Sequence, residues 1–532
     1  MSSIVKYQKN GITYLYESIS YRNEERKPRN KRTLIGKLDE VTGKPIYHHD
    51  YIEKMKKAGT PVEENKPSEK YDEREISSSF VSEYGSIYFL EQLAKNNGLK
   101  DSLYHMLPSL YNEIFYLASF LLCSNEPMMY CEDWMKSTYS KDCRSLTPKF
   151  ISQLFSSITQ KERDTFYSSW CEDKKDGDYL ALDITSISSY SKLIDTVGWG
   201  YNRDHENLPQ INMCMLFSEK SKLPIYQTIY QGELKDVVTL KTTLAQMKLF
   251  DLTDVTIIMD KGFASLKNIE DMCEAKMKFI ISLPFTLKFV TEAIRHVKDT
   301  ILDVEHTIEI NGDTLYASTI QKVISNGKKV HTHVYYNRKK AVGIEDSLNA
   351  HVTGLKNLAL EDRDNTKYKS EFDKYLIIRN SSLEERGYTV SIDKEAVNKE
   401  IKNAGWIVII SDSVSDAKRV IQLYRNKDVV EKSFDRLKNN LDMNRLRVQS
   451  EQAMQNKAFI SFISLILVSN IDQVMHETKL CDKGYTIKKL VKELSRLKIQ
   501  IIKDHPILFP LTKAQKMIYD EFDMKYPVGI PS

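Results

Sequence analysis

Three acidic residues occupy positions from which a folded chain can bring carboxylates together. Asp183 lies in the apolar stretch DYLALDITSIS, Asp260 directly follows the apolar run VTIIM, and Glu431 lies in a segment with helical spacing. Positions just beyond strand ends are where α/β sheets place ligands. Three carboxylates there would repel one another unless a cation neutralised them, and oxygen-only ligation suits Mg²⁺ or Mn²⁺. Two such ions about 4 Å apart promote phosphoryl transfer. We therefore expect these three residues to be catalytic and to bind two metal ions.

A row of polar side chains accompanies Glu431. On a helix that turns about 100° per residue, one arc of roughly 60° holds Tyr424, Lys427, Glu431 and Lys438. The neighbouring arc is apolar and holds Val430, Phe434, Leu437 and Leu441. The polar row therefore runs along the border of a buried face. There, Lys427 and Lys438 would supply positive charge for DNA phosphates, and Tyr424 would donate a hydrogen bond to a phosphate oxygen.

Each of these residues also has a simpler explanation. Lys427 and Glu431 form an i,i+4 pair, which stabilises any exposed helix by a few tenths of a kcal/mol. A single aspartate at a strand end is more often a turn or helix-cap residue. The catalytic interpretation is favoured because all three carboxylates occur in this order together with a lysine-flanked helix.

These motifs resemble those of the DDE transposases of bacterial insertion sequences, and more narrowly the insertion-sequence-four superfamily. That superfamily carries its third acidic residue in a helix with the signature Y-x2-R-x3-E-x6-K, which is similar to the row from Tyr424 to Lys438 with the spacing kept. Its first aspartate is followed by Thr or Ser, as in LDITS, and its second begins D-[RK]-G-[FY], as in MDKGF. The resemblance covers about residues 180–475. Other family-like segments are GYNRDHENLPQ, YQGELKDVVTL and the N-terminal YLYES…PRNKRTLIGKLD.

The resemblance implies a fold, a reaction and partners. The fold is a ribonuclease-H-like core with a β insertion between the second aspartate and the glutamate. The substrate is double-stranded DNA, namely the terminal inverted repeats of the element and the target DNA. The reaction is nicking at the transposon ends, often through a hairpin intermediate, followed by strand transfer. We expect a homodimer in the DNA complex and no membrane partner.

Two positions depart from the family or need separate weighing. Lys427 replaces the signature arginine, which keeps the charge but loses the planar bidentate fork, so either a phosphate or a carboxylate contact is open to it.

In relatives, a tryptophan on the strand before the signature helix stacks on a flipped base. Trp406 in GWIVIIS is similarly placed, and such stacking stabilises an extruded base by about 1–3 kcal/mol. The alternative for Trp406 is a core aromatic at a strand start. The loop YQGELKD lacks the family's asparagine and is assigned no role.

The elements that must position these residues follow from the apolar pattern. Strands alternate with helical segments from residue 178 onward, which predicts an α/β fold. Asn311-Gly312 and Asn326-Gly327 are hairpin signals within an otherwise alternating stretch. The run AFISFISLILVSNI (458–471) is shorter than the ~20 residues that span a bilayer, so we expect a buried helix. The expected segments are a basic, mostly β N-terminal region with a linker (1–75), a helical domain (76–175), the first part of the core (176–289), a mostly β insertion (290–400), the second part of the core (401–475) and a C-terminal region (476–532).

The N-terminal region contains a basic cluster. YRNEERKPRNKRTLIGK has seven basic residues against two acidic ones, and its proline predicts a loop or hairpin tip. We expect Arg29, Lys31 and Arg32 to contact the DNA backbone. The alternative is a solvated loop. The polar stretch TPVEENKPSEKYDEREIS (60–77) is interpreted as a linker.

Bulk composition narrows the class of protein. The 532 residues are 41% hydrophobic and 28% charged, as in an ordinary folded protein of several domains. A net charge of +4 does not by itself indicate a nucleic-acid partner, so local clusters must do so. Seven cysteines without a C-x-x-C pair fit a reducing cytosol and argue against a zinc module. The N-terminus lacks the apolar core of a signal peptide, so we expect a cytoplasmic protein.

Other function classes stay open. A nuclease on the same core would cut DNA without joining the ends to a target. A non-catalytic DNA-binding derivative would keep the fold and lose the reaction. A structural protein with chance carboxylates would show no metal-dependent change in stability.

Overall fold

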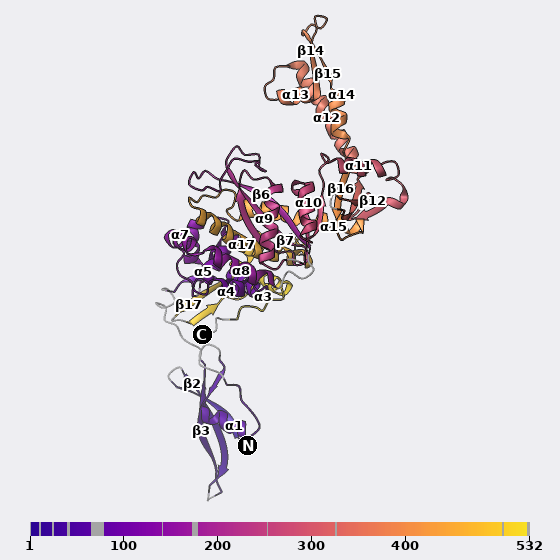
Figure 1. Cartoon of the computed structure of the whole chain (residues 1–532). Coiled ribbons are helices and arrows are strands. Elements are labelled where there is room, and N and C mark those ends of the chain that lie inside the picture. Colours follow the sequence, from indigo (N-terminus) through magenta and orange to yellow (C-terminus); the bar gives the residue numbers. More distant parts are fainter. Residues whose placement is uncertain are drawn as a thin grey trace. The chain divides into compact units, whose positions relative to one another are not determined.

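The structure is a computed structural model of the chain (Figure 1). It describes residues 2–9, 12–23, 26–39, 43–64, 79–140, 142–172, 179–252, 254–324, 327–502 and 505–528. These residues form two compact units, one built from the described parts of 1–80 and 500–507 and the other from those of 81–499 and 508–531. Most of the expected linker, from residue 65 to residue 77, lies outside the described residues.

The first unit contains a four-stranded antiparallel sheet in the order β1-β2-β3-β4. Its small core is formed by Leu15, Ile35 and Tyr51, which are buried between the sheet and the helix that follows it. The elements are β1 (Ser2–Lys9), β2 (Ile12–Arg22), β3 (Pro28–Leu38), β4 (Pro45–Tyr47) and α1 (His49–Lys57).

The basic cluster of this unit lies in the β2–β3 hairpin, which agrees with the expected hairpin tip, while most of its residues belong to strands and not to a loop. Arg29, Lys31 and Arg32 lie within β3, and their Cα partners on β2 are Tyr21, Ile19 and Ser18. The turn lies between Asn23 and Lys27. Polar composition suggested a loop, but pairing with β2 uses backbone hydrogen bonds, which a basic side chain does not prevent. The three basic side chains are exposed.

The second unit begins with a short strand and a set of helices, as the apolar spacing predicts. Their buried aromatic residues include Phe89, Phe115, Phe166 and Trp170. Two of the helices, α5 and α7, pack against the later helix α17 (Glu451–Glu477). The elements are β5 (Val81–Glu83), α3 (Gly85–Asn96), α4 (Leu99–Met106), α5 (Tyr111–Ser124), η1 (Met128–Tyr130), α6 (Cys131–Ser137), α7 (Pro148–Ser157) and α8 (Gln160–Glu172).

A nine-stranded mixed sheet carries the candidate site. Five of its strands lie in the order β8-β7-β6-β9-β10, with β7 antiparallel to both of its neighbours and β6, β9 and β10 parallel. Numbered along the chain, this order is 3-2-1-4-5, which is the topology of a ribonuclease-H-like core. The elements are β6 (Tyr179–Ser188), β7 (Gln210–Ser218), β8 (Pro224–Gln231), α9 (Asp236–Leu249), β9 (Thr256–Met259), η2 (Lys261–Phe263), α10 (Leu266–Glu274) and β10 (Lys278–Ser282).

The first half of the insertion extends this same sheet. Strand β16 (Trp406–Ser411) pairs antiparallel with β10 on one side and with β13 on the other, and β12 and β11 follow outward. Asn311 and Gly312 form the predicted turn between β11 and β12, both with positive φ. Asn326 of the second hairpin signal lies outside the described residues. The elements are α11 (Lys288–Val297), η3 (Val304–His306), β11 (Thr307–Ile310), β12 (Asp313–Val323) and β13 (Lys329–Tyr336).

The second half of the insertion is mainly helical, with two short strands, β14 and β15. The expected mostly β character therefore holds for the first half, with β11, β12 and β13, and not for the second half. The 24-residue helix α12 is not predicted from the sequence. Few of its side chains are buried, among them Val352 and Leu355. Its apolar periodicity is therefore weak. This part has its own small core around Phe372 and Tyr388. The elements are α12 (Arg338–Glu361), α13 (Lys369–Tyr375), β14 (Leu376–Asn380), β15 (Tyr388–Ile392) and α14 (Lys394–Ile401).

The segment after β16 was expected to form one long helix and forms two. Helices α15 (Ala417–Asn426) and α16 (Asp428–Asn440) meet at Lys427. The predicted apolar helix lies within α17. Among the described residues, α17 is the one helix that is long and apolar enough to cross a membrane, and 78% of its apolar window is buried inside the protein. It is thus a core helix. The remaining elements are α18 (Ile487–Ser495), β17 (Lys498–Ile502), β18 (His505–Leu508) and α19 (Lys513–Glu521).

A buried histidine in the sheet makes stability depend on pH. His333 on β13 is fully buried, its Nδ1 lies 2.9 Å from the Thr319 hydroxyl, and its Nε2 lies 3.0 Å from the Val414 carbonyl oxygen. Because the carbonyl can only accept, Nε2 carries a proton and donates to it. Burial lowers the pKa of His333 from 6.5 to about 4.

We predict that the second unit loses stability as pH falls from 6.5 toward 4. In this range the unfolded chain binds a proton at His333 and the folded chain does not, which costs up to about 3 kcal/mol. Urea unfolding at pH 7 and pH 4.5 should show a smaller loss for His333→Gln than for the wild type. His296→Gln, an exposed histidine of α11 in the same unit, should behave as the wild type. Equal acid sensitivity in all three proteins would contradict the assignment.

Candidate active site

The register of two parallel strands brings the two aspartates together. Leu182 on β6 is the Cα partner of Met259 on β9. Asp183 directly follows Leu182, and Asp260 directly follows Met259. The two aspartates therefore lie at adjacent positions on neighbouring strands, which are about 4.8 Å apart. Asp183 lies within β6, which continues to Ser188, and not near its end as expected. Asp260 directly follows β9, as predicted.

Helix α16 brings the third carboxylate to the same place. Its apolar stripe is buried as predicted, and Val430 and Leu437 are fully covered. This packing leaves Glu431 on the edge of the helix, with 62% of its side chain exposed. Asp183, Asp260 and Glu431 line one cavity of about 700 Å³. Its other lining residues are Ile184, Thr185, Arg203, Asp204, Glu206, Phe434, Asp435, Lys438, Asn439, Asn444 and Arg445.

Lys427 lies inside this group of carboxylates. Its Nζ atom is 3.1 Å from Asp183 Oδ2 and 3.3 Å from Glu431 Oε1, and only 4% of its side chain is exposed. The helical chain tightens here, because the Lys427 N–H donates to the Tyr424 carbonyl and the Val430 N–H donates to the Lys427 carbonyl. Both bonds span three residues, as in a 3₁₀ turn. The junction between α15 and α16 therefore carries the lysine that pairs with the acidic residues.

The charges of this pair are shaped by burial and by each other. Burial raises the pKa of Asp183, while the Lys427 ammonium acts in the opposite direction. Burial opposes the charged form of Lys427, but the carboxylates of Asp183 and Asp260 outweigh it and raise the pKa of Lys427. Lys427 is therefore a cation held in place by the acidic residues around it.

Tyr424 contacts the second aspartate. Its hydroxyl donates to Asp260 Oδ1 at 2.9 Å, and the same oxygen accepts the Lys261 N–H at 2.7 Å. Burial raises the pKa of Tyr424, and the charge of Asp260 raises it further. The hydroxyl is therefore neutral and orients the Asp260 carboxylate.

The polar row predicted to touch DNA is thus engaged with acidic side chains of the chain itself. Lys438 Nζ lies 2.8 and 2.6 Å from the two carboxylate oxygens of Asp204. The structure brings Tyr424, Lys427 and Lys438 to one site with the three carboxylates, and contact of these three with phosphate stays a prediction.

Trp406 is the first residue of β16, in agreement with the expected strand start. It is half-buried, and its ring centroid lies 4.7 Å from that of Tyr336, its partner on β13. A base-stacking role for Trp406 stays a prediction. Arg29, Lys31 and Arg32 belong to the first unit and do not line the cavity.

Sequence reasoning missed a second layer of charged residues around the cavity. The segment 200–210 resembles the family in sequence but has no predicted role. In the structure it supplies Arg203, Asp204 and Glu206 to the cavity. Glu206 accepts hydrogen bonds from Ser188 and from Arg445, each at 2.5 Å. The signal available in the sequence was the density of charge in GYNRDHENLPQ, but its partners lie far away in the chain.

The donor set fits a hard divalent cation in its chemistry. Three carboxylates from three separate elements line one polar cavity, and oxygen ligands of this kind suit Mg²⁺ or Mn²⁺. Among the described residues, however, no three His, Cys, Asp or Glu side chains lie close enough together to hold an ion. The Lys427 ammonium lies between two of the carboxylates instead.

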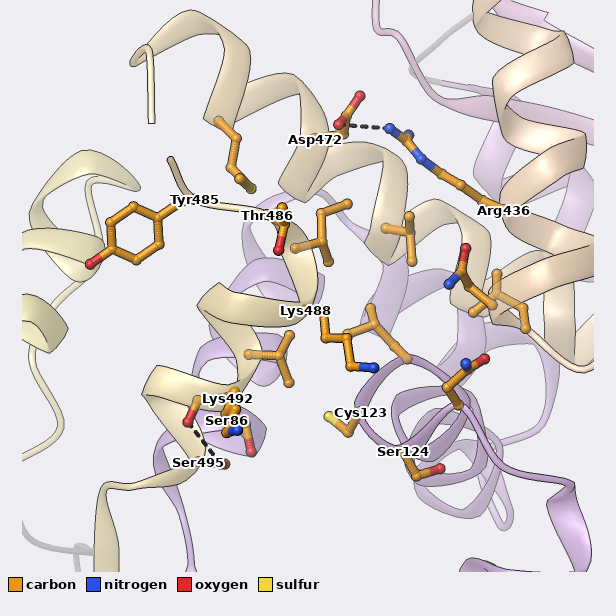
Figure 2. Close-up of a pocket in the computed structure, with 18 of the residues that line it drawn as sticks. Ser86, Cys123, Ser124, Arg436, Asp472, Tyr485, Thr486, Lys488, Lys492 and Ser495 are labelled. Atoms are coloured by element: carbon orange, nitrogen blue, oxygen red, sulfur yellow. Dashed lines mark hydrogen bonds and ion pairs between the residues drawn. The ribbon is translucent and has the colours of Figure 1, made fainter. Parts of the chain in front are cut away.

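A second cavity lies beside α16 and holds none of the predicted site residues. It has a volume of about 600 Å³ and is lined by parts of α5, α16, α17 and α18. Figure 2 shows the ion pair between Arg436 on α16 and Asp472 on α17 at its border, at 2.8 Å. The same helix therefore contributes Glu431 to one cavity and Arg436 to another.

Gly232 packs against backbone atoms near the two ends of the segment 200–210 and has no space for a side chain. A Cβ atom on Gly232 would lie 2.0 Å from the Gln210 carbonyl oxygen and 2.6 Å from that of Gly198. The loop YQGELKD, to which sequence assigned no role, thus packs closely against the strand and loop that flank Arg203, Asp204 and Glu206.

We predict that Gly232→Ala destabilises the second unit by about 3 kcal/mol, because backbone atoms would have to move. Gly354→Ala is the matched control. No atom lies within 4 Å of its built Cβ in α12, and alanine should stabilise that helix by about 0.5–1 kcal/mol. Urea unfolding of both variants tests this pair. A neutral Gly232→Ala would show that the close approach is not required.

The family described as "Transposase DDE domain" matches residues 174–467. Among solved structures, the chain is similar to a piggyBac transposase synaptic complex with hairpin DNA, with 10% sequence identity, a TM-score of 0.37 and coverage of 79% of this chain and 77% of that chain. No curated protein matches the chain.

Proposed function

Because the chain belongs to the transposase DDE domain family, we propose that it is a DNA transposase that cleaves the ends of its own element and transfers them into target DNA. The observation that carries the proposal is the convergence of Asp183, Asp260 and Glu431, from β6, the end of β9 and α16, on one cavity. The narrower assignment to the insertion-sequence-four superfamily is part of this proposal. It is supported by the spacing of Tyr424, Lys427, Glu431 and Lys438.

In this proposal Asp183, Asp260 and Glu431 hold two Mg²⁺ or Mn²⁺ ions. When bound, such ions supply charge stabilisation for the attacking and leaving oxygens of phosphoryl transfer. Glu431 is the exposed residue of the three, with 62% of its side chain accessible, whereas Asp183 and Asp260 are partly buried. Tyr424 keeps Asp260 oriented through its hydroxyl.

Three cations at the cavity are suited to bind the DNA backbone. Arg203, Lys438 and Arg445 line it, and their acidic partners are Asp236, Asp204 and Glu206. All of these pairs are partly exposed, and exposed pairs contribute little stability. A phosphate group can therefore replace an acidic partner at small cost.

The remaining expectations belong to the same proposal. The protein acts in the cytoplasm on double-stranded DNA as a homodimer, and Trp406 stacks on a base near the cleaved end. The first unit contributes DNA affinity through the exposed basic side chains of β3. This assignment is supported by the exposure of Arg29, Lys31 and Arg32 on strand β3, since exposed basic side chains suit the phosphate backbone.

We predict that Glu431→Gln abolishes Mg²⁺-dependent cleavage of a plasmid carrying the gene's own flanking DNA and leaves binding to that DNA intact. The amide keeps the shape of the side chain but loses the charge that ligates a metal ion. Asp428→Asn is the matched control, because Asp428 is an exposed acidic residue in the first turn of the same helix and does not line the cavity. It should cleave as the wild type, and EDTA should stop both active proteins.

The outcomes separate the proposed function from its rivals. Release of one defined fragment, followed by joining to a second plasmid, would establish transposition. Cutting scattered along the plasmid would indicate a nuclease without strand transfer. DNA binding without cleavage by the wild type would indicate a non-catalytic derivative.

We predict that the triple variant R29Q/K31Q/R32Q binds DNA more weakly and with a smaller salt dependence. Loss of three phosphate contacts should reduce the slope of log K against log salt by about 2.7. The charge-conserving variant R29K/K31R/R32K is the control and should keep the slope. An unchanged slope in the glutamine variant would place the DNA contact elsewhere.

A further inference from the structure

The charge at the centre of the candidate site comes from the chain itself. Lys427 Nζ is within hydrogen-bonding distance of Asp183 Oδ2 and Glu431 Oε1, two of the oxygen-bearing groups proposed as metal ligands. Its side chain is 4% exposed, compared with 13% for Lys438 and 24% for Arg445. Of these three cations, Lys427 alone is buried and pairs with the proposed ligands.

The other cations of the cavity have different partners. Arg203 pairs with Asp236, and Lys438 and Arg445 pair with Asp204 and Glu206. None of these acceptors is among the three catalytic candidates. The charges of Asp183 and Glu431 are therefore balanced mainly by Lys427, and this balance does not require a bound ion.

The backbone holds Lys427 in this position. It joins two helices through the 3₁₀-type turns described above, and Leu423 and Val430 on either side are fully buried. The ammonium therefore has little freedom to leave the carboxylates by a movement of the backbone. A divalent ion that binds Asp183 and Glu431 would meet a fixed positive charge close by, which opposes its binding.

We propose that Lys427 is a built-in counter-cation of the carboxylate site, which competes with the divalent ions for Asp183 and Glu431. It positions both side chains when no metal ion is bound and weakens the affinity of the site for metal. This inference rests on the proposed function, and it assigns Lys427 a role other than the phosphate contact expected from sequence. The planar fork of the arginine in the family signature presents several donors in a fixed geometry, whereas the lysine ammonium is a compact point charge on a flexible stem.

The test is Mn²⁺ binding to the full-length protein without DNA, measured by calorimetry, together with thermal unfolding in the presence and absence of Mn²⁺. Lys427→Met keeps the length of the side chain and removes its charge. We expect this variant to melt at a lower temperature than the wild type without metal, and to bind Mn²⁺ at least tenfold more tightly. Lys432→Met makes the same change on an exposed lysine of α16 outside the cavity and should match the wild type in both measurements.

A double variant keeps the inference testable if Lys427→Met folds poorly. In D183N/K427M the carboxylate charge is removed with its partner, so the melting temperature without metal should return toward that of the wild type. Failure of this rescue would overturn the counter-cation role.

The metal measurement separates this inference from the proposed function. Equal Mn²⁺ affinity of the wild type and Lys427→Met would overturn the competition while leaving the metal site in place. Absence of Mn²⁺ binding in every variant would overturn both the competition and the metal assignment.

Discussion

The contact of one buried lysine with two carboxylates connects the parts of the second unit that carry the candidate chemistry. Asp183 belongs to the first strand of the core, and Lys427 and Glu431 belong to the helical pair that follows the insertion. Acidic side chains at this density cannot share a cavity unless positive charge compensates them. The ammonium of Lys427 supplies that charge from within the fold, and the position of α16 on the sheet follows from it as well as from apolar packing.

The apolar framework makes this contact possible. Strands β6 and β9 are buried on both faces, and their parallel register places Asp183 and Asp260 side by side. Helix α16 packs on β6, and α17 lies behind it as a core helix with many fully buried side chains. The insertion adds four strands to the sheet between the second aspartate and the glutamate when β16 is included. The acidic residues are thus far apart in the chain, and the pairing of β6 with β9 and the packing of α16 on β6 bring them to one cavity.

Ion pairs within the chain line the cavity. Lysine and arginine side chains suited to phosphate all have acidic partners, and those partners come largely from one segment, residues 200–210. Each of these pairs is partly exposed, and such pairs contribute little stability. The contact of Lys427 with Asp183 is different, because only 4% of the lysine side chain and 17% of the aspartate side chain are exposed. The site therefore has an outer layer of partly exposed ion pairs and an inner, mostly buried pair between Lys427 and Asp183.

The sequence by itself determined the three carboxylates, their order, and the strands and helix that carry them. The apolar strands that carry Asp183 and end at Asp260 are local features, and so are the apolar stripe of α16 and the buried helix at 458–471. Features without a strong local pattern were misjudged. The mostly exposed helix α12 has too few buried residues to show its period, and the basic residues of β3 look like a loop although backbone pairing makes them a strand.

Only the tertiary structure decided which charges face one another. Lys427 lies on the same helical row as Glu431. It is 244 positions from Asp183 along the chain, and no spacing rule connects Lys427 to Asp183. The partners of Glu206 and Asp204 are similarly remote. A charged side chain takes its partner from whatever the packing of strands and helices brings within a few ångströms, and that packing is driven by apolar residues elsewhere. The sequence thus specified the acidic residues of the site, and the fold specified the cation that balances them.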